Sequence, residues 1–138
     1  VLTRARRRLS GRTDVALLKG RADALPFADG SFDRVICALL VHHLSPAAQR
    51  RALLEAARVL RPGGRLHVAD WGRPRGALGR AGSLVLRMLD GFENTGPPVR
   101  GELPGLLRAA GFAPVAVTHC LPTVWGMLEL LRAERCMS

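Results

Sequence analysis

A predicted strand-helix-strand unit constrains the fold of this chain more than any other feature. Residues 32–41 contain an apolar run without period-two alternation, which is typical of a strand covered on both faces in a parallel sheet. Ser45, followed by proline, predicts a helix N-cap, and residues 61–64 (RPGG) predict the end of that helix. Residues 65–71 predict the second strand. Two strands joined in this way must be parallel with a right-handed crossover, so we expect an α/β fold.

The remaining predicted elements flank this unit. The sequence predicts a helix at residues 1–9, a short strand at 15–18 (VALL), helices at 83–92 and 102–110, and strands at 112–120 and 123–133. A tight Leu121-Pro122 turn would make the last two strands antiparallel. The helix after Ser45 should bury the stripe Leu53, Ala56, Ala57 and Leu60.

The formal net charge of +10 raises the question of a nucleic-acid partner. Lys19 is the only lysine among 21 basic residues, and the chain has no tyrosine. A preference for arginine over lysine is typical of proteins from GC-rich genomes. A phosphate-binding surface would more often mix arginine with lysine and carry interleaved aromatic residues. The dense cluster Arg4, Arg6, Arg7 and Arg8 is interpreted as the solvated end of a helix. We therefore expect no nucleic-acid partner, and a basic nucleic-acid-binding domain ranks third among the functions considered.

Cysteine usage and hydropathy indicate the compartment. Cys37, Cys120 and Cys136 are far apart and show no metal-type spacing, so we expect no metal site. No apolar run reaches the ~18 residues of a membrane span. These features favour a cytoplasmic protein. The chain opens on Val1 in the middle of a helical pattern, and we expect a fragment whose front is missing.

Ionisable residues follow both strands of the central unit. His42 and His43 come after the first strand, and Asp70 ends the second. The carboxyl ends of parallel strands meet at one edge of the sheet, where ligands bind in open α/β folds. Either histidine could take a proton from a substrate hydroxyl, and Asp70 could orient a substrate amine or hydroxyl. Structural roles, a histidine bonded to backbone and a capping aspartate, remain the alternatives.

Several motifs together resemble one known family. ADALPF-x-DGSFDRV (residues 22–35), the strand ending in HHL, the helix closing on LRPGG and the tail motif AGF-x-x-V resemble class I S-adenosylmethionine-dependent methyltransferases. The small-molecule branch that includes ubiquinone/menaquinone-biosynthesis enzymes is the most similar. The resemblance implies a Rossmann-like doubly wound sheet of strand order 3-2-1-4-5-7-6, with the last strand antiparallel.

On that map the chain supplies strands 3 to 7. We expect residues 1–138 to be a single partial methyltransferase domain that lacks the family's N-terminal glycine loop, with residues 73–100 as an insert on the acceptor side. Residues 15–18 would be strand 3. We expect weak or no binding of S-adenosylhomocysteine by these 138 residues alone.

The resemblance also implies cofactor-binding residues. Asp23 would accept a hydrogen bond from the adenine amino group, and the Ala24 backbone N–H would meet a ring nitrogen. Ala38 and Leu39 would line the methionine portion through backbone atoms. A turn-capping Asp23 and plain core packing of Ala38 are the alternatives.

The function implied is transfer of a methyl group from S-adenosylmethionine to a small acceptor, which the apolar residues within 73–100 suggest is hydrophobic or lipid-like. The alternative is a non-catalytic, truncated α/β module that acts through protein association. Exposed strand edges would make self-association a hazard for such a module.

Overall fold

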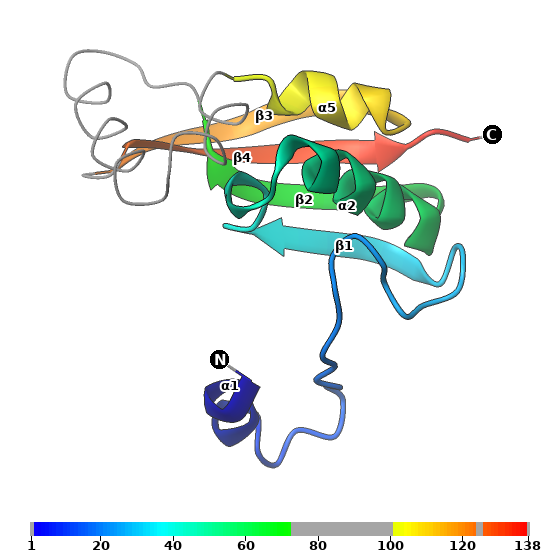
Figure 1. Ribbon diagram of the computed structural model, residues 1–138, viewed down its shortest axis with the longest axis vertical. Coiled ribbons are helices and arrows are strands. Elements are labelled where there is room, and N and C mark those ends of the chain that lie inside the picture. The colour runs from blue at the N-terminus through cyan, green and yellow to red at the C-terminus, as the bar shows by residue number, and fades with distance from the viewer. Residues whose placement is uncertain (1, 73–100, 124–125, 138) are drawn as a thin grey trace.

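A mixed four-stranded sheet lies at the centre of the part of the chain that the structure, a computed structural model, describes: residues 2–72, 101–123 and 126–137 (Figure 1). The strand order is β1 (Phe32–Ala38), β2 (Leu60–Trp71), β4 (Gly126–Arg135), β3 (Phe112–Thr123). β1 and β2 are parallel, and β4 is antiparallel to both of its neighbours. This is the order expected for the last four strands of the seven-stranded sheet, so the predicted partial Rossmann-like fold is confirmed.

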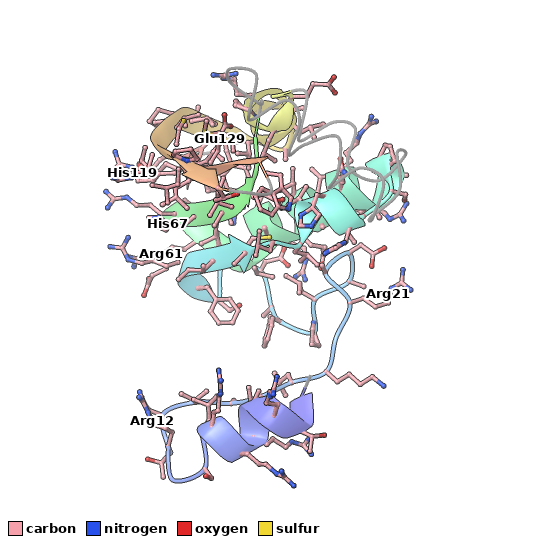
Figure 2. The ribbon with its side chains drawn as sticks, turned by 90° about the vertical axis from the view of Figure 1, so that its left-hand side faces the viewer. Arg12, Arg21, Arg61, His67, His119 and Glu129 are labelled. Carbon is pink, nitrogen blue, oxygen red and sulfur yellow. The ribbon has the colours of Figure 1, made fainter. Side chains whose placement is uncertain are left out.

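Helices α2 (Pro46–Val59) and α5 (Leu103–Ala109) cover the same face of the sheet (Figure 1). The core between these layers is apolar and comes from all of them, with Leu53 and Ala56 of α2, Leu66 and Val68 of β2, Leu103 and Leu107 of α5, Phe112 of β3, and Leu131 and Ala133 of β4. His67 and His119 are directed to the opposite side of the sheet, away from these helices (Figure 2). Helix α1 (Leu2–Arg8) stands apart from the sheet at the end of an extended segment.

The predicted crossover β1-α2-β2 is present. Ser45 caps α2 by accepting a hydrogen bond from the Ala48 backbone N–H at 3.4 Å, and Pro46 occupies the first turn. The helix ends at Val59, and its buried residues include the predicted Leu53 and Ala56. The predicted Ala57 is only partly buried, and Leu60, which is buried, begins β2 instead of ending the helix. The parallel register joins Cys37 to Val68 and Ala38 to Ala69, which brings the carboxyl ends of β1 and β2 to one edge.

Two strand predictions were wrong. Residues 15–18 form no strand: Leu18 is 58% exposed, and no strand pairs with this segment within the described residues. Four apolar residues cannot satisfy their backbone groups as a strand without a partner. β1 ends at Ala38, short of the predicted end at residue 41, because Leu39 takes a left-handed φ of 49° and a 3-10 helix, η1 (Val41–His43), follows. β1 is also open on one face, where Ile36 is 78% exposed.

The predicted turn at Leu121-Pro122 was placed too early. Both residues belong to β3 and lie opposite Leu128 and Met127, and the strands stay paired as far as Thr123 and Gly126. Proline is tolerated here because β3 is an edge strand of the described sheet. The predicted helix at 83–92 and the predicted acceptor-side insert at 73–100 lie outside the described residues. Among the described helices, none has the length and apolar character to cross a membrane.

Candidate functional site

Asp70 joins the ends of β2 and η1 at the carboxyl edge of the sheet. Its side chain is fully buried. Oδ2 accepts a hydrogen bond from the Val41 backbone N–H at 2.8 Å, and Oδ1 accepts one from the Trp71 backbone N–H at 2.8 Å. The same Oδ1 lies 2.6 Å from His42 Nδ1. One carboxylate therefore holds three groups from two segments of the chain in a fixed arrangement.

The structure brings together two of the three predicted catalytic residues. His42 is 2% exposed, and a carboxylate partner accepts from Nδ1, so that nitrogen carries a proton. The ring of Trp71 packs edge-on against the ring of His42, and the two ring centroids are 6.3 Å apart. His43 is exposed, and its ring packs on His42 at a centroid separation of 3.9 Å. Asp70 thus orients His42, while His43 faces outward.

Gln49 was missed from the sequence although it supports this arrangement. It is fully buried on α2, and its Nε2 donates to the Val41 carbonyl at 3.1 Å and the Leu44 carbonyl at 2.9 Å. It thereby fixes both ends of η1 against the helix. Gln49 follows two alanines at the start of a helix, and a glutamine in that context is usually exposed. The sequence therefore gives no sign that this one is buried.

Asp23 and Ala24, the residues expected to hold adenine, lie in one turn, and both already have protein partners. The Asp23 carboxylate, 11% exposed, accepts from Arg21 Nε at 2.9 Å and from Arg51 Nη2 at 3.3 Å. Its hydrogen bonds from Arg21 lower the pKa of Asp23 from 3.8 to about 2. The Ala24 backbone N–H donates to the Arg21 carbonyl at 3.3 Å. Each arginine donates two hydrogen bonds, so the four acceptor sites of the carboxylate are in use, and a ligand donor would have to displace one of these contacts.

Ala38 and Leu39 border a largely apolar pocket of about 390 Å³ between β1 and α2. Ala22 and Leu25, which flank the Asp23-Ala24 turn, line the same pocket. The left-handed Leu39 is held in place by a hydrogen bond from its backbone N–H to the Ala69 carbonyl at 2.8 Å. Ala38 and Leu39 therefore share one cavity with the residues on either side of Asp23 and Ala24, while Asp23 and Ala24 themselves do not line it.

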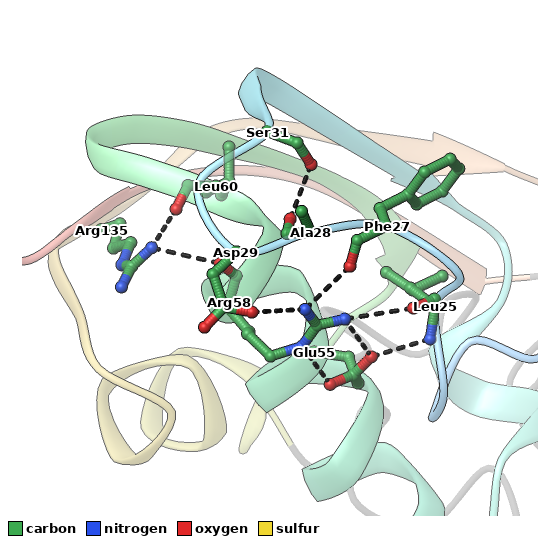
Figure 3. Close-up of polar contacts among 9 residues, drawn as sticks. All are labelled: Leu25, Phe27, Ala28, Asp29, Ser31, Glu55, Arg58, Leu60 and Arg135. Carbon is green, nitrogen blue, oxygen red and sulfur yellow. Dashed lines mark hydrogen bonds and ion pairs between the residues drawn. The ribbon is translucent and has the colours of Figure 1, made fainter.

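Glu55 and Arg58, here called the loop clamp, hold the segment after Asp23 against α2 (Figure 3). Glu55 Oε2 accepts from the Leu25 backbone N–H at 2.7 Å. Arg58 donates to the carbonyls of Leu25 and Phe27 at 3.1 and 2.8 Å, and to Asp29 Oδ1 at 2.6 Å. The two clamp residues are themselves joined by hydrogen bonds of 2.7 and 3.0 Å. The i, i+3 spacing of the pair was visible in the sequence, but it predicts only an ion pair on the helix surface.

The loop clamp makes stability depend on pH. Hydrogen bonding from Arg58, and then from the Leu25 N–H, lowers the pKa of Glu55 from its ordinary 4.5 to about 2. A carboxyl whose folded pKa is depressed contributes stability above its unfolded pKa and loses it as pH falls toward the folded value. Glu55 should therefore stabilise the fold fully above about pH 4.5 and progressively less down to about pH 2.

We expect Glu55→Gln to flatten the acid side of the stability profile. Urea midpoints measured from pH 7 to pH 3 should fall steeply below about pH 4.5 in the parent protein and less steeply in Glu55→Gln, because the variant has no proton to gain there. The matched control is Glu134→Gln, whose carboxylate is more exposed and lies 3.4 Å from Arg65. Equal slopes in the parent and in Glu55→Gln would contradict this account.

Comparison with known proteins agrees with the geometry. A family model described as "Methyltransferase domain" matches residues 1–68. The demethylmenaquinone methyltransferase of Beutenbergia cavernae is 49% identical over 63 residues, covering 46% of this chain and 25% of that protein. The enzyme of the same name from Thermus thermophilus is 38% identical over 119 residues, covering 85% of this chain and 50% of that protein. The chain thus spans a quarter to a half of these two relatives.

Solved structures give the same fold. An S-adenosylmethionine-dependent methyltransferase of Thermotoga maritima, described as a possible histamine N-methyltransferase, superposes with a TM-score of 0.73 at 26% identity, covering 93% of this chain and 68% of that one. The YcgJ protein of Bacillus subtilis superposes with a TM-score of 0.72 at 20% identity over 99% of this chain and 77% of that one, a likeness of fold.

Proposed function

The chain belongs to the class I S-adenosylmethionine-dependent methyltransferases, and from this premise we propose that it takes part in methyl transfer to a small hydrophobic acceptor of the hydroquinone class. The observation that carries the proposal is the pocket shared by Ala38, Leu39 and the turn that bears Asp23. The acceptor class is proposed because several relatives are named for demethylmenaquinone or for ubiquinone/menaquinone biosynthesis.

The residues on the pocket fit the cofactor. Its apolar walls suit an adenine ring and a thioether. The Asp23 carboxylate and the Ala24 N–H lie on the turn between the lining residues Ala22 and Leu25, and they would read one edge of a purine by exchanging their contacts with Arg21 and Arg51. S-adenosylmethionine supplies an electrophilic methyl group when bound. The protein then needs to position the acceptor in line and to exclude water, rather than to form a covalent intermediate. Ala38 and Leu39 would line the cofactor, and Asp23 would orient it.

We propose a role in proton transfer for the histidines at the carboxyl edge of the sheet. When the acceptor must lose a proton, a histidine is the side chain suited to receive it near neutral pH. We propose His42 or His43 for this step, with Asp70 holding the His42 ring and its tautomer. The fully buried Asp70 acts through His42 and is a positioning residue.

Direct methyl transfer tests the proposal. The protein as its gene encodes it would be incubated with S-adenosylmethionine and 1,4-dihydroxynaphthalene, and the product analysed by mass spectrometry. A monomethylated naphthalenediol formed in proportion to enzyme supports the proposal. S-adenosylhomocysteine binding without any transfer would support the cofactor site and overturn the acceptor class.

Narrowing the pocket should weaken cofactor binding. We expect Ala38→Leu to raise the Kd for S-adenosylhomocysteine roughly tenfold or more, because the added side chain occupies space beside Leu39. Ala47→Leu is the matched control, since Ala47 is exposed on α2. Isothermal calorimetry measures both. An unchanged Kd in Ala38→Leu would place the cofactor elsewhere.

The alternative of a non-catalytic association module has one supporting observation, the exposed Ile36 on the outer side of β1. The named relatives are methyltransferases, and the comparisons therefore favour the enzyme. Self-association through the β1 edge remains a prediction, which sedimentation over a range of protein concentrations would test.

A further inference from the structure

Glu129 is a buried carboxylate on β4 that the proposed mechanism does not use (labelled in Figure 2). It is 6% exposed and lies on the same face of the strand as the core residues Met127, Leu131 and Ala133. A buried carboxylate costs folding free energy unless donors compensate for the lost water. Within the described residues, no hydrogen bond or ion pair reaches Glu129.

The side chain is aimed at the carboxyl edge of β2. In the antiparallel register Glu129 lies opposite Asp70, yet its carboxyl group reaches Gly72, two residues further along β2. A Cβ at Gly72 would lie 2.1 Å from Glu129 Cδ and 2.5 Å from Oε1. The carboxylate thus occupies the space that a side chain at position 72 would fill, and it extends toward the edge where open α/β sheets bind their ligands.

Asp70 and Glu129 are adjacent carboxylates with different surroundings. Directly opposed residues on antiparallel strands have Cβ atoms about 5 Å apart, so each carboxylate adds repulsion to the burial cost of the other. Asp70 is compensated by Val41, Trp71 and His42. Glu129 has no such compensation from the described residues. A donor supplied by a bound molecule would provide it.

We propose that Glu129 belongs to the acceptor site and accepts a hydrogen bond from a hydroxyl group of the methyl acceptor. This inference rests on the proposed function and narrows it, because it requires an acceptor with a hydroxyl group that can reach Gly72 from the carboxyl edge. The contact positions the acceptor beside the His42–Asp70 pair. It also explains a carboxylate in the apolar segment GMLELL, where a methionine or leucine would pack as well.

The experiment measures the binding of three ligands to the protein as its gene encodes it. Calorimetry first gives the Kd for S-adenosylhomocysteine, and then, on that complex, the Kd for 1,4-dihydroxynaphthalene and for benzylamine. The variants are Glu129→Met, which fills the space without a charge, and Glu129→Gln, which preserves the shape if the methionine variant fails to fold. Glu134→Gln on the same strand is the control.

We expect Glu129→Met to weaken diol binding roughly 10- to 100-fold, the range for a lost hydrogen bond to a charged group. Affinity for S-adenosylhomocysteine should be unchanged, and the melting temperature equal or higher, because an uncompensated buried charge is removed. Glu129→Gln should weaken diol binding less.

Unchanged diol affinity in both variants, or a lower melting temperature with no change in binding, would overturn the inference. Binding of benzylamine in place of the diol would overturn its hydroxyl specificity. Failure of the parent protein to bind S-adenosylhomocysteine would instead overturn the proposed function, and this inference with it.

Discussion

Replacing Asp70 by alanine is expected to lower the free energy of unfolding by about 3–5 kcal/mol, the range for breaking a buried charged network. The variant leaves the N–H groups of Val41 and Trp71 without their acceptor and removes the carboxylate partner of His42. The contacts with Val41 and His42 join η1 to the end of β2. Loss of this much stability would leave many small domains largely unfolded.

Urea denaturation followed by circular dichroism measures the effect. Asp33→Ala is the matched control, because Asp33 is an exposed aspartate on β1 that pairs with Arg61 at 2.8 Å, and such surface pairs are worth about 0–1 kcal/mol. Asp70→Asn should be intermediate, since an amide oxygen can still accept from the backbone. A loss below about 1 kcal/mol for Asp70→Ala would show that the network does not hold the edge of the sheet.

Replacing Arg58 by alanine is expected to release the segment after Asp23 and Ala24, the turn that we propose binds adenine. The substitution removes the donors to Leu25, Phe27 and Asp29 and leaves Glu55 without its guanidinium partner. We expect the melting temperature to fall by roughly 5–10 °C. Affinity for S-adenosylhomocysteine should fall about tenfold or more, because the turn must then be ordered on binding.

Two further variants separate charge from geometry. Arg58→Lys should recover little of the loss, since an ammonium cannot reproduce a planar fork that binds two carbonyls and a carboxylate together. Arg50→Ala, at an exposed position on the same helix, should leave both measurements unchanged. Equal melting temperatures for Arg58→Ala and Arg50→Ala would contradict the clamp.

Local patterns predicted the elements of the central unit but not all of its boundaries, since β1 ends at Ala38 and β2 begins at Leu60. Ser45 and Pro46 begin α2, Pro-Gly-Gly follows it, and a continuous apolar run marks β1. The strand order came from the resemblance, since pairing between distant strands leaves no mark on local sequence. The failed strand at 15–18 has the same cause: its apolar pattern is correct for a strand, but a strand exists only beside a partner.

The candidate site also contains residues that the sequence predicted and residues that it did not. The position of His42 and Asp70 after two parallel strands was enough to predict that they meet. The partners of Asp23 were not predictable, because Arg51 reaches it from α2 across 28 positions of sequence. Glu129 was missed, although a single acidic residue within an apolar strand, in phase with Met127 and Leu131, is a signal that period-two analysis can detect.

The most direct test of the central claim is a calorimetric titration of the protein, as its gene encodes it, with S-adenosylhomocysteine. We expect saturable one-to-one binding that Asp23→Ala weakens roughly tenfold or more, because the variant loses a hydrogen bond to a carboxylate. Asp14→Ala, which removes an exposed partner of Arg12, should leave the affinity unchanged. Absence of binding, or an affinity that Asp23→Ala does not change, would contradict the assignment of this pocket to the cofactor.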